Sequence, residues 1–400
     1  MKPAYNRLFL AKTCRGAQKP TPEPSTNPRS MLMLSYLTSI VLLAAALPGM
    51  ALPKAEFNKT IKKEFPVTPN GTTYLDNKYG KIEVKTWDQN RVKITVTIKV
   101  KAGSESAAND VFDRIGINFS SGEGYVKAET HIEPATKGWL WSWIGNTGSD
   151  YSINYEVFLP ASNNLDIGHR YGDLFVAAMK GRVKLDVKYV NFKIEAMGDN
   201  SSLLFGYGNG TISRAGNLNA EISYSKLLVE EAADIQITSK YTQVNIGKAK
   251  DLNTTTKYDT YVINQIEALK NSGAYDNFKI NSAASIDFNS KYAGLKAEKI
   301  GRYLHCDLSY GNVDVKMSEG FSKVNCTGSY GNAKIGLPQG TPFAIDAATN
   351  YAGISYPDNL DIDYLVEKIT STTLQGKTGK AAEALIYLRL NYGGAKIYYF

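Results

Sequence analysis

Residues 218–263 read LNAEISYSKLLVEEAADIQITSKYTQVNIGKAKDLNTTTKYDTYVI, and they repeat one pattern. Apolar residues alternate with polar ones up to a tyrosine, as in Leu218, Ala220, Ile222 and Tyr224. The alternation resumes three and five residues later, after a slip of parity filled by small or polar side chains. Alternation of period two indicates a β-strand, and the slip indicates a tight corner. Each repeat therefore predicts a strand, a corner, a second strand and a turn.

The anchor tyrosine recurs between residues 171 and 351. Eleven tyrosines follow one another at intervals of 17 to 21 residues: Tyr171, Tyr189, Tyr207, Tyr224, Tyr241, Tyr258, Tyr275, Tyr292, Tyr310, Tyr330 and Tyr351. Seventeen residues cannot hold a crossover helix, so equivalent strands must stack directly as coils of a β-solenoid. The sequence predicts an all-β fold of about eleven coils of 17–18 residues. Its tyrosines would stack as a structural ladder, with a tyrosine-lined binding surface as the alternative.

Two further tyrosines carry the same context outside this run. Tyr79 lies in KYGKIEV at 78–84, and Tyr392 lies in NYGGAKI at 391–397. The repeat is therefore expected at both ends of the chain.

Two cysteines test the register of the repeat. Cys306 and Cys326 each lie four residues before an anchor tyrosine, so we expect them to be neighbours in the stack. A spacing of about 4.8 Å is within reach of a disulfide. In-register parallel strands seldom orient the Cβ atoms correctly, so we favour two buried thiols and keep the disulfide as the alternative.

The first 51 residues have the composition of a targeting segment. Residues 31–47 are uncharged and follow Arg29, and small residues at 49 and 51 fit a signal-peptide cleavage site. We expect Met31 to be the true start, with export to the periplasm or the outer cell surface, and an uncleaved membrane anchor as the alternative. Removing residues 1–51 reduces the net charge from +8 to +3, with 40 basic and 37 acidic residues left. This balance argues against a nucleic-acid partner.

Residues 52–160 lack the regular repeat except at Tyr79, and we expect them to cap the solenoid. Residues 104–115, SESAANDVFDRI, predict one short amphipathic helix that begins at an N-cap serine. Such a cap would protect the strand edges that an open solenoid exposes. Residues 161–400 then form the repeats, with a polar insertion near residues 370–380.

The residue types that carry catalysis are scarce. His131, His169 and His305 are scattered, without metal-ligand spacing, and we interpret them as solvated surface side chains. We expect no metal, no cofactor and no enzymatic activity.

One segment is the candidate binding site. Trp139, Trp141 and Trp143 share one face of a short strand or hairpin. Aromatic rows of this kind stack on sugars or approach membrane interfaces, and the alternative is that they pack onto the core of the cap.

Residues 74–84 (YLDNKYGKIEV), Trp87 and the alternating strand at 92–100, followed by the Tyr-Gly repeats, resemble the putative-adhesin domain family of bacterial envelope proteins, in the form common in Bacteroidetes. The resemblance covers about residues 57–400. It implies an exported β-solenoid without established catalytic residues. We therefore expect a non-enzymatic scaffold that binds an envelope glycan or protein. The alternatives are an accessory of an envelope-stress system and a β-helix carbohydrate-active enzyme.

Overall fold

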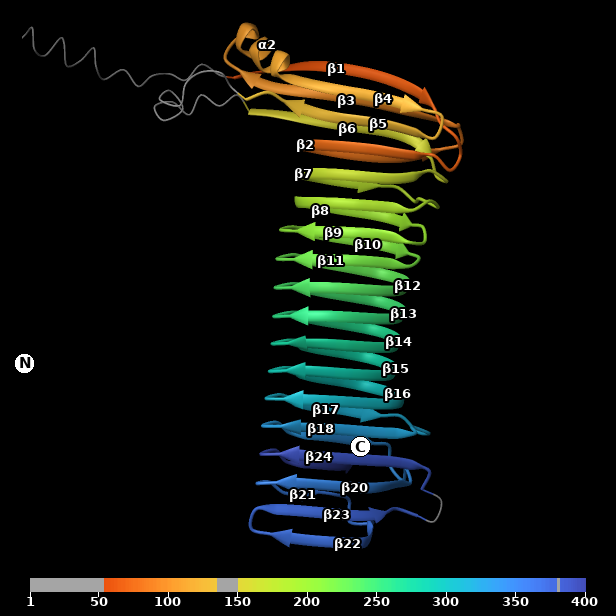
Figure 1. Ribbon diagram of the computed structural model, residues 1–400, viewed down its shortest axis with the longest axis vertical. Coiled ribbons are helices and arrows are strands. Elements are labelled where there is room, and N and C mark those ends of the chain that lie inside the picture. Colours follow the sequence, from red (N-terminus) through yellow and green to blue (C-terminus); the bar gives the residue numbers. More distant parts are fainter. Residues whose placement is uncertain (1–53, 135–149, 380–381) are drawn as a thin grey trace, which may run out of the picture. The chain divides into compact units, whose positions relative to one another are not determined.

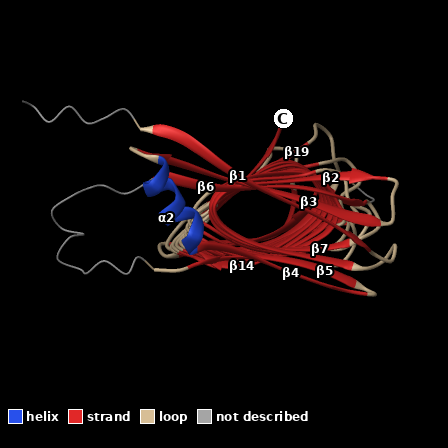
Figure 2. Ribbon diagram, turned by 90° about the horizontal axis from the view of Figure 1, so that it is seen from above, coloured by secondary structure: helices blue, strands red, loops and turns tan. Residues whose placement is uncertain are grey.

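A computed structural model describes residues 54–134, 150–379 and 382–400 of the chain. The described residues form a β-solenoid whose coils stack along one axis (Figure 1). Seen along that axis, the coil is a flattened oval with strands on two opposite sides (Figure 2). The predicted all-β solenoid, with a mixed N-terminal region that holds one short helix, is confirmed.

Each coil contributes one strand segment to each side. The segments before the tyrosines form one parallel sheet, here called sheet one, and the segments after them form sheet two. The regular coils consist of β7 (Asn164–Val176), β8 (Val183–Met197), β9 (Ser201–Gly206), β10 (Asn209–Ala215), β11 (Leu218–Ser223), β12 (Lys226–Lys240), β13 (Gln243–Lys257), β14 (Thr260–Ala274), β15 (Asn277–Lys291), β16 (Gly294–Ser309), β17 (Asn312–Met317), β18 (Lys323–Ser329) and β19 (Ala333–Leu337).

Antiparallel strands close the N-terminal end. This region consists of β1 (Ala55–Pro66), β2 (Thr72–Trp87), β3 (Arg91–Ala102), α2 (Glu105–Arg114), β4 (Ile115–Gly122), β5 (Tyr125–Ile132) and β6 (Asp150–Pro160). Strand β2 is the first coil, and β5 and β4 continue sheet one beyond it. Strands β6, β3 and β1 continue sheet two. The predicted helix is capped by Ser104, whose side chain accepts a hydrogen bond from the backbone N–H of Ala107.

The tyrosine forms the corner between the two sheets. All thirteen repeat tyrosines adopt left-handed backbone conformations, with φ between 53° and 64°. The corner keeps its hydrogen bonds: the Tyr241 N–H donates to the Lys257 carbonyl of the next coil (3.0 Å), and the Gln243 N–H donates to the Ser225 carbonyl of the previous one (3.0 Å). A bulky residue in this conformation costs about 1–3 kcal/mol, so neighbouring coils must hold it in place.

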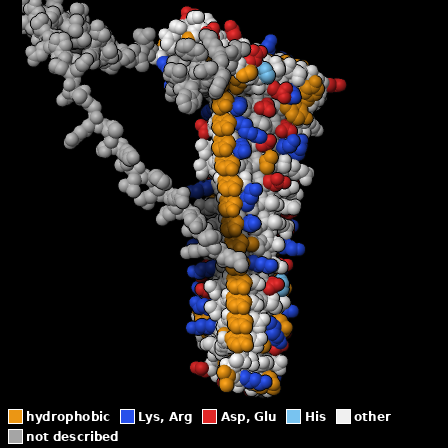
Figure 3. All heavy atoms as spheres, turned by 60° about the vertical axis from the view of Figure 1, so that its left-hand side comes forward, with side chains coloured by type: hydrophobic (Ala, Val, Ile, Leu, Met, Phe, Trp, Pro, Cys, Tyr) orange, Lys and Arg blue, Asp and Glu red, His pale blue; other side chains and the backbone are white. Residues whose placement is uncertain are grey.

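The rings of these tyrosines stack in one continuous ladder. Neighbouring centroids lie 4.6 to 5.3 Å apart, and the ring planes deviate by at most 17°. From Tyr171 onward the ladder is exposed, with 40% to 60% of each residue accessible. It forms an apolar stripe along the unit, here called the tyrosine stripe (Figure 3). The ladder therefore belongs to the surface, and the core consists of the aliphatic residues that alternate with it.

The C-terminal coils do not stack in sequence order. The last coil, β24 (Ala384–Asn391) and β25 (Ala395–Tyr399), lies between β18–β19 and the coil formed by β20 (Phe343–Asn350) and β21 (Ile354–Ser355) (Figure 1). Tyr392 accordingly stacks on Tyr330 and Tyr351, with centroids 4.8 and 4.6 Å away. The repeat occurs at both ends of the chain, as expected, since Tyr79 and Tyr392 both form corners. The last coil of the chain is nevertheless not the last coil of the stack, because β24 pairs on both edges.

The segment expected as a polar insertion near residues 370–380 contains a strand. Strands β22 (Asp361–Lys368) and β23 (Ser371–Lys377) form an antiparallel hairpin. Strand β23 also pairs with β20, so this hairpin extends sheet one at the C-terminal end.

The two cysteines lie directly opposite each other in β16 and β18, as the register of the repeat predicts. Their Cα atoms are 4.7 Å apart, and the structure joins them in a disulfide, the alternative that the sequence did not favour. Cys306 and Cys326 are both buried, so this bond crosslinks neighbouring coils inside the core.

Replacing Tyr258 separates the cost of its backbone conformation from the contribution of its ring. We expect Tyr258→Phe to unfold like the wild type, because the stack remains. Tyr258→Asn should lower the free energy of unfolding by about 1–3 kcal/mol, since asparagine tolerates positive φ but forfeits two ring contacts. Tyr258→Val should cost more, because a β-branched residue is strained there. Urea unfolding followed by circular dichroism measures all three, and equal stability of the Asn and Phe variants would contradict the role of stacking.

Removing the disulfide should also be measurable. The crosslink spans 20 residues, so the Cys306→Ala/Cys326→Ala variant is expected to lose about 3 kcal/mol of unfolding free energy. Thiol labelling of the denatured wild type should find two more reactive cysteines after reduction than before. The same count in both conditions would show that these cysteines are free thiols.

Candidate functional site

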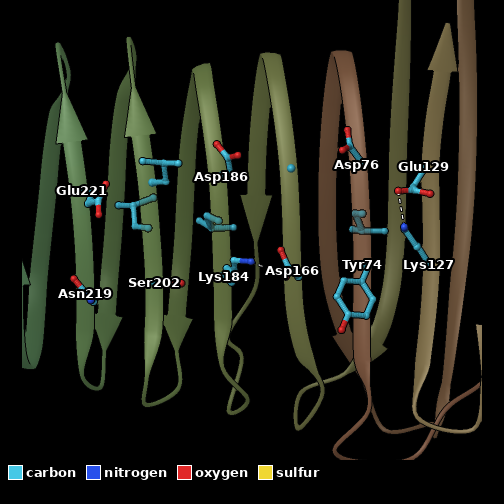
Figure 4. Close-up of a pocket in the computed structure, with 15 residues that line it drawn as sticks. Tyr74, Asp76, Lys127, Glu129, Asp166, Lys184, Asp186, Ser202, Asn219 and Glu221 are labelled. Carbon is cyan, nitrogen blue, oxygen red and sulfur yellow. Dashed lines mark ion pairs between the residues drawn. The ribbon is translucent and has the colours of Figure 1, made fainter.

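A hollow crosses the outer face of sheet one near the N-terminal end of the unit. It has a volume of about 570 Å³ and extends over neighbouring strands from β5 to β11 (Figure 4). The charged and polar side chains that line it point outward from the sheet. The hollow therefore runs along the direction in which the coils stack.

Two columns of the strand register build the lining. One column contains Glu129, Asp76, Gly168, Asp186, Leu204 and Glu221 on successive strands. The other, two residues earlier on each strand, contains Lys127, Tyr74, Asp166, Lys184, Ser202 and Asn219. Both columns face outward because side chains two residues apart share one face of a strand.

Gly168 opens the floor of the hollow. A Cβ atom at this position would lie 3.2 Å from Oδ2 of Asp76, which is tighter than an ordinary contact. A larger residue would therefore fill the space between the carboxylates of Asp76 and Asp186, which lie on either side of this strand.

The carboxylates of the hollow differ in their electrostatic surroundings. Partial burial raises the pKa of Asp76, and the nearby Glu129 raises it further. Asp186 instead pairs with Arg170 at 2.7 Å. Lys127 pairs with Glu129 at 2.7 Å.

The hollow as a whole is acidic, with an apolar component. Five carboxylates face two lysines, and Leu204 and Tyr74 are 49% and 37% exposed. Among residues 54–134, 150–379 and 382–400, no three His, Cys, Asp or Glu side chains converge as a metal site. Such a lining can donate and accept hydrogen bonds along an extended, hydroxyl-rich or amine-bearing ligand.

The residues singled out from the sequence lie elsewhere. Trp139, Trp141 and Trp143 fall outside the described residues, so their role as a binding site stays a prediction. His131 is exposed on β5, and His305 is half-buried on β16.

His169 corrects the expectation of a solvated histidine. Its ring is fully buried, with Nδ1 3.1 Å from the Asn77 carbonyl oxygen and Nε2 3.0 Å from that of Gly80. Burial lowers its pKa, and the ring belongs to the core beneath the first corners.

The sequence did not predict the hollow. Its acidic column combines strands that are far apart in the chain, since Asp76 lies beside both Glu129 and Gly168. The available signal was the copy of the repeat at Tyr79, which places β2 in register with β7.

No helix among the described residues has the length and apolar character needed to cross a membrane.

Comparison with known proteins finds resemblance only among solved structures. No family profile and no curated protein sequence matches the chain. One similar structure is a putative cell adhesion protein from Clostridium sporogenes, 11% identical, with a TM-score of 0.19 over 86% of this chain and 100% of that one. A putative adhesin from Parabacteroides distasonis is 11% identical, with a TM-score of 0.23 over 85% and 97%. A putative lipid binding protein from the same organism is 10% identical, with a TM-score of 0.22 over 85% and 96%.

The adhesin descriptions fit the family resemblance seen in the sequence.

A second polar cluster lies buried beneath the corners of the middle coils. The Asp259 carboxylate accepts hydrogen bonds from the Ser239 hydroxyl (2.8 Å) and the Thr242 N–H (2.7 Å). Its own N–H donates to the Asp276 carboxylate at 3.0 Å, and the Thr256 hydroxyl also donates to Asp276. Burial raises the pKa of Asp259 to about 6 and raises that of Asp276 as well.

This cluster predicts a pH dependence of stability. Because the pKa of Asp259 is higher in the folded state, folding favours the proton, and this contribution is lost as pH rises through about 6. We expect the melting temperature of the wild type, relative to that of Asp259→Asn, to fall between pH 4 and pH 7. Calorimetry of both proteins across this range measures it, and a constant difference would contradict the raised pKa.

Proposed function

We propose that the protein is an exported, non-enzymatic scaffold that binds an extended glycan of the cell envelope through its outer face. The observation that carries the proposal is the hollow on sheet one. It is open along the stacking direction, so a polymer can lie across several coils without its ends being enclosed.

The lining supports a ligand rich in hydroxyl and amino groups. Glu221 forms no ion pair among the described residues and can bind an amino group, and Glu129 and Asp186, which pair with Lys127 and Arg170, extend the line of carboxylates over several strands. The side chains of Ser202 and Asn219 add uncharged hydrogen-bonding groups, and the exposed part of Leu204 offers an apolar contact.

The rigidity of the coils supports binding by surface contacts. The backbone under the hollow is held by parallel ladders on both edges of β7, β8 and β9. A preformed surface of this kind loses little conformational entropy on binding. Export would bring it into contact with envelope polymers.

A bulky residue in the hollow provides the test. We expect Ser202→Trp to reduce binding of chitosan oligomers, measured by titration calorimetry, at least tenfold, because the indole fills the space between the two columns. The control is Thr211→Trp, which lies on the other sheet at the following strand, β10, and should bind like the wild type.

Two outcomes would overturn the proposal. Equal binding by both variants and the wild type would remove the hollow as the site. New reducing ends in chitosan incubated with the wild type, but not with Asp76→Asn, would show an enzyme in which the carboxyl of high pKa acts as the acid.

A further inference from the structure

The tyrosine stripe has a cationic flank along the middle coils. The residue just before each corner tyrosine forms one register column, which in these coils consists of Lys240, Lys257, Ala274 and Lys291. The Lys257 ammonium lies 5.7 Å from the ring centroid of Tyr258. The lysines therefore form a row beside the tyrosine stripe, interrupted at Ala274.

These ammonium groups have no acidic partner among the described residues. Lys240, Lys257 and Lys291 form no ion pair there, in contrast to the lysines around the acidic hollow. The next outward column, two residues earlier, is neutral in these coils and contains Thr238, Thr255, Ser272 and Asn289. The buried Asp259 and Asp276 point beneath the corners, where they bond to Ser239, Thr242 and Thr256.

The other flank of the stripe is a shallow groove. It has a volume of about 620 Å³ and is lined by Tyr224, Tyr241 and Tyr258 together with polar residues of the following positions: Asn209, Ser225, Lys226, Thr242 and Gln243. A ligand seated there would meet phenol groups on one side and amide, hydroxyl and ammonium groups on the other.

The corner itself does not require an aromatic ring. Left-handed conformations are less costly for asparagine or glycine, and asparagine occupies one elsewhere in this chain, at Asn200. The stacked rings are 40% to 60% exposed from Tyr171 onward, so they remain accessible to a ligand. An exposed aromatic row that folding does not demand is typical of an interaction surface.

We propose that the tyrosine stripe from Tyr224 to Tyr292, with its lysine flank and groove, binds an extended carboxylated polysaccharide. The unpaired lysines complement carboxylates that repeat along the polymer. Hydroxyl and amide groups of the groove bond to sugar hydroxyls, and the tyrosines contact the apolar C–H edges of the rings. This surface is separate from the hollow, and its ligand has the opposite charge.

The test compares two forms of one polymer. Polygalacturonate should bind the full chain in titration calorimetry, with an affinity that falls as salt is added, whereas the fully methyl-esterified polymer should not. Lys240→Gln/Lys257→Gln/Lys291→Gln should weaken polygalacturonate binding about tenfold or more. The matched control, Lys62→Gln/Lys63→Gln/Lys101→Gln, removes the same charge from exposed lysines of β1 and β3 and should bind like the wild type.

Ring variants and a competitor complete the test. Tyr241→Asn should weaken binding while Tyr241→Phe retains most of it, with the fold of each checked by circular dichroism. Ser202→Trp should leave polygalacturonate binding intact, so failure of this proposal and failure of the hollow are distinguishable. Equal weakening by both lysine triples would overturn the proposal, and so would equally tight binding of the esterified polymer. If duplex DNA displaced polygalacturonate and bound with equal affinity, the stripe would be a general polyanion site. That result would overturn the proposal of a polysaccharide ligand.

Discussion

The structure depends on the parallel, in-register hydrogen-bond ladder that joins each coil to the next. A single coil of this length has too little apolar surface to fold alone, so its stability comes from its neighbours. The ladder continues through the corner, where the tyrosine N–H reaches the next coil and the N–H two residues later reaches the previous one. These bonds hold thirteen tyrosines in a conformation that each would avoid in isolation.

These backbone hydrogen bonds also align equivalent residues of successive coils in columns on the surface. Residues at the same offset from successive tyrosines lie about 4.8 Å apart, however many residues separate them along the chain. Asp76 and Gly168 are neighbours in this sense despite the N-terminal strands between them, and so are Asn391 and Asn350. The side chains that share a column therefore determine the local surface chemistry, and a site can be built from single residues of several coils.

Much of the fold could be predicted because the repeat encodes it locally. Alternation identified the strands, the offset from tyrosine placed Cys306 opposite Cys326, and Ser104 marked the start of the helix. The order of the last coils could not be predicted, because a coil that carries Tyr392 fits any neighbour with the same corner. The acidic hollow was missed for a related reason: β5 joins sheet one from outside the regular run and brings Glu129 beside Asp76. His169 is buried because its ring lies beneath the corner of the neighbouring coil, between the carbonyl groups of Asn77 and Gly80. The alternation within its own repeat does not indicate this contact.

The two candidate surfaces share one solenoid and carry opposite charge. The acidic column ends at Glu221, and Lys240, Lys257 and Lys291 lie one, two and four coils farther along, at about 5, 10 and 19 Å along the stacking axis. The Debye length at physiological ionic strength is about 8 Å, so salt screens most of the attraction that Lys257 and Lys291 feel, whereas Lys240 lies within reach of the acidic column. A net charge of only +3 for residues 52–400 thus conceals an acidic region and a basic one. Because a solenoid can lengthen by whole coils without disturbing the others, it can carry such regions side by side, and each can be tuned by substitutions in its own columns.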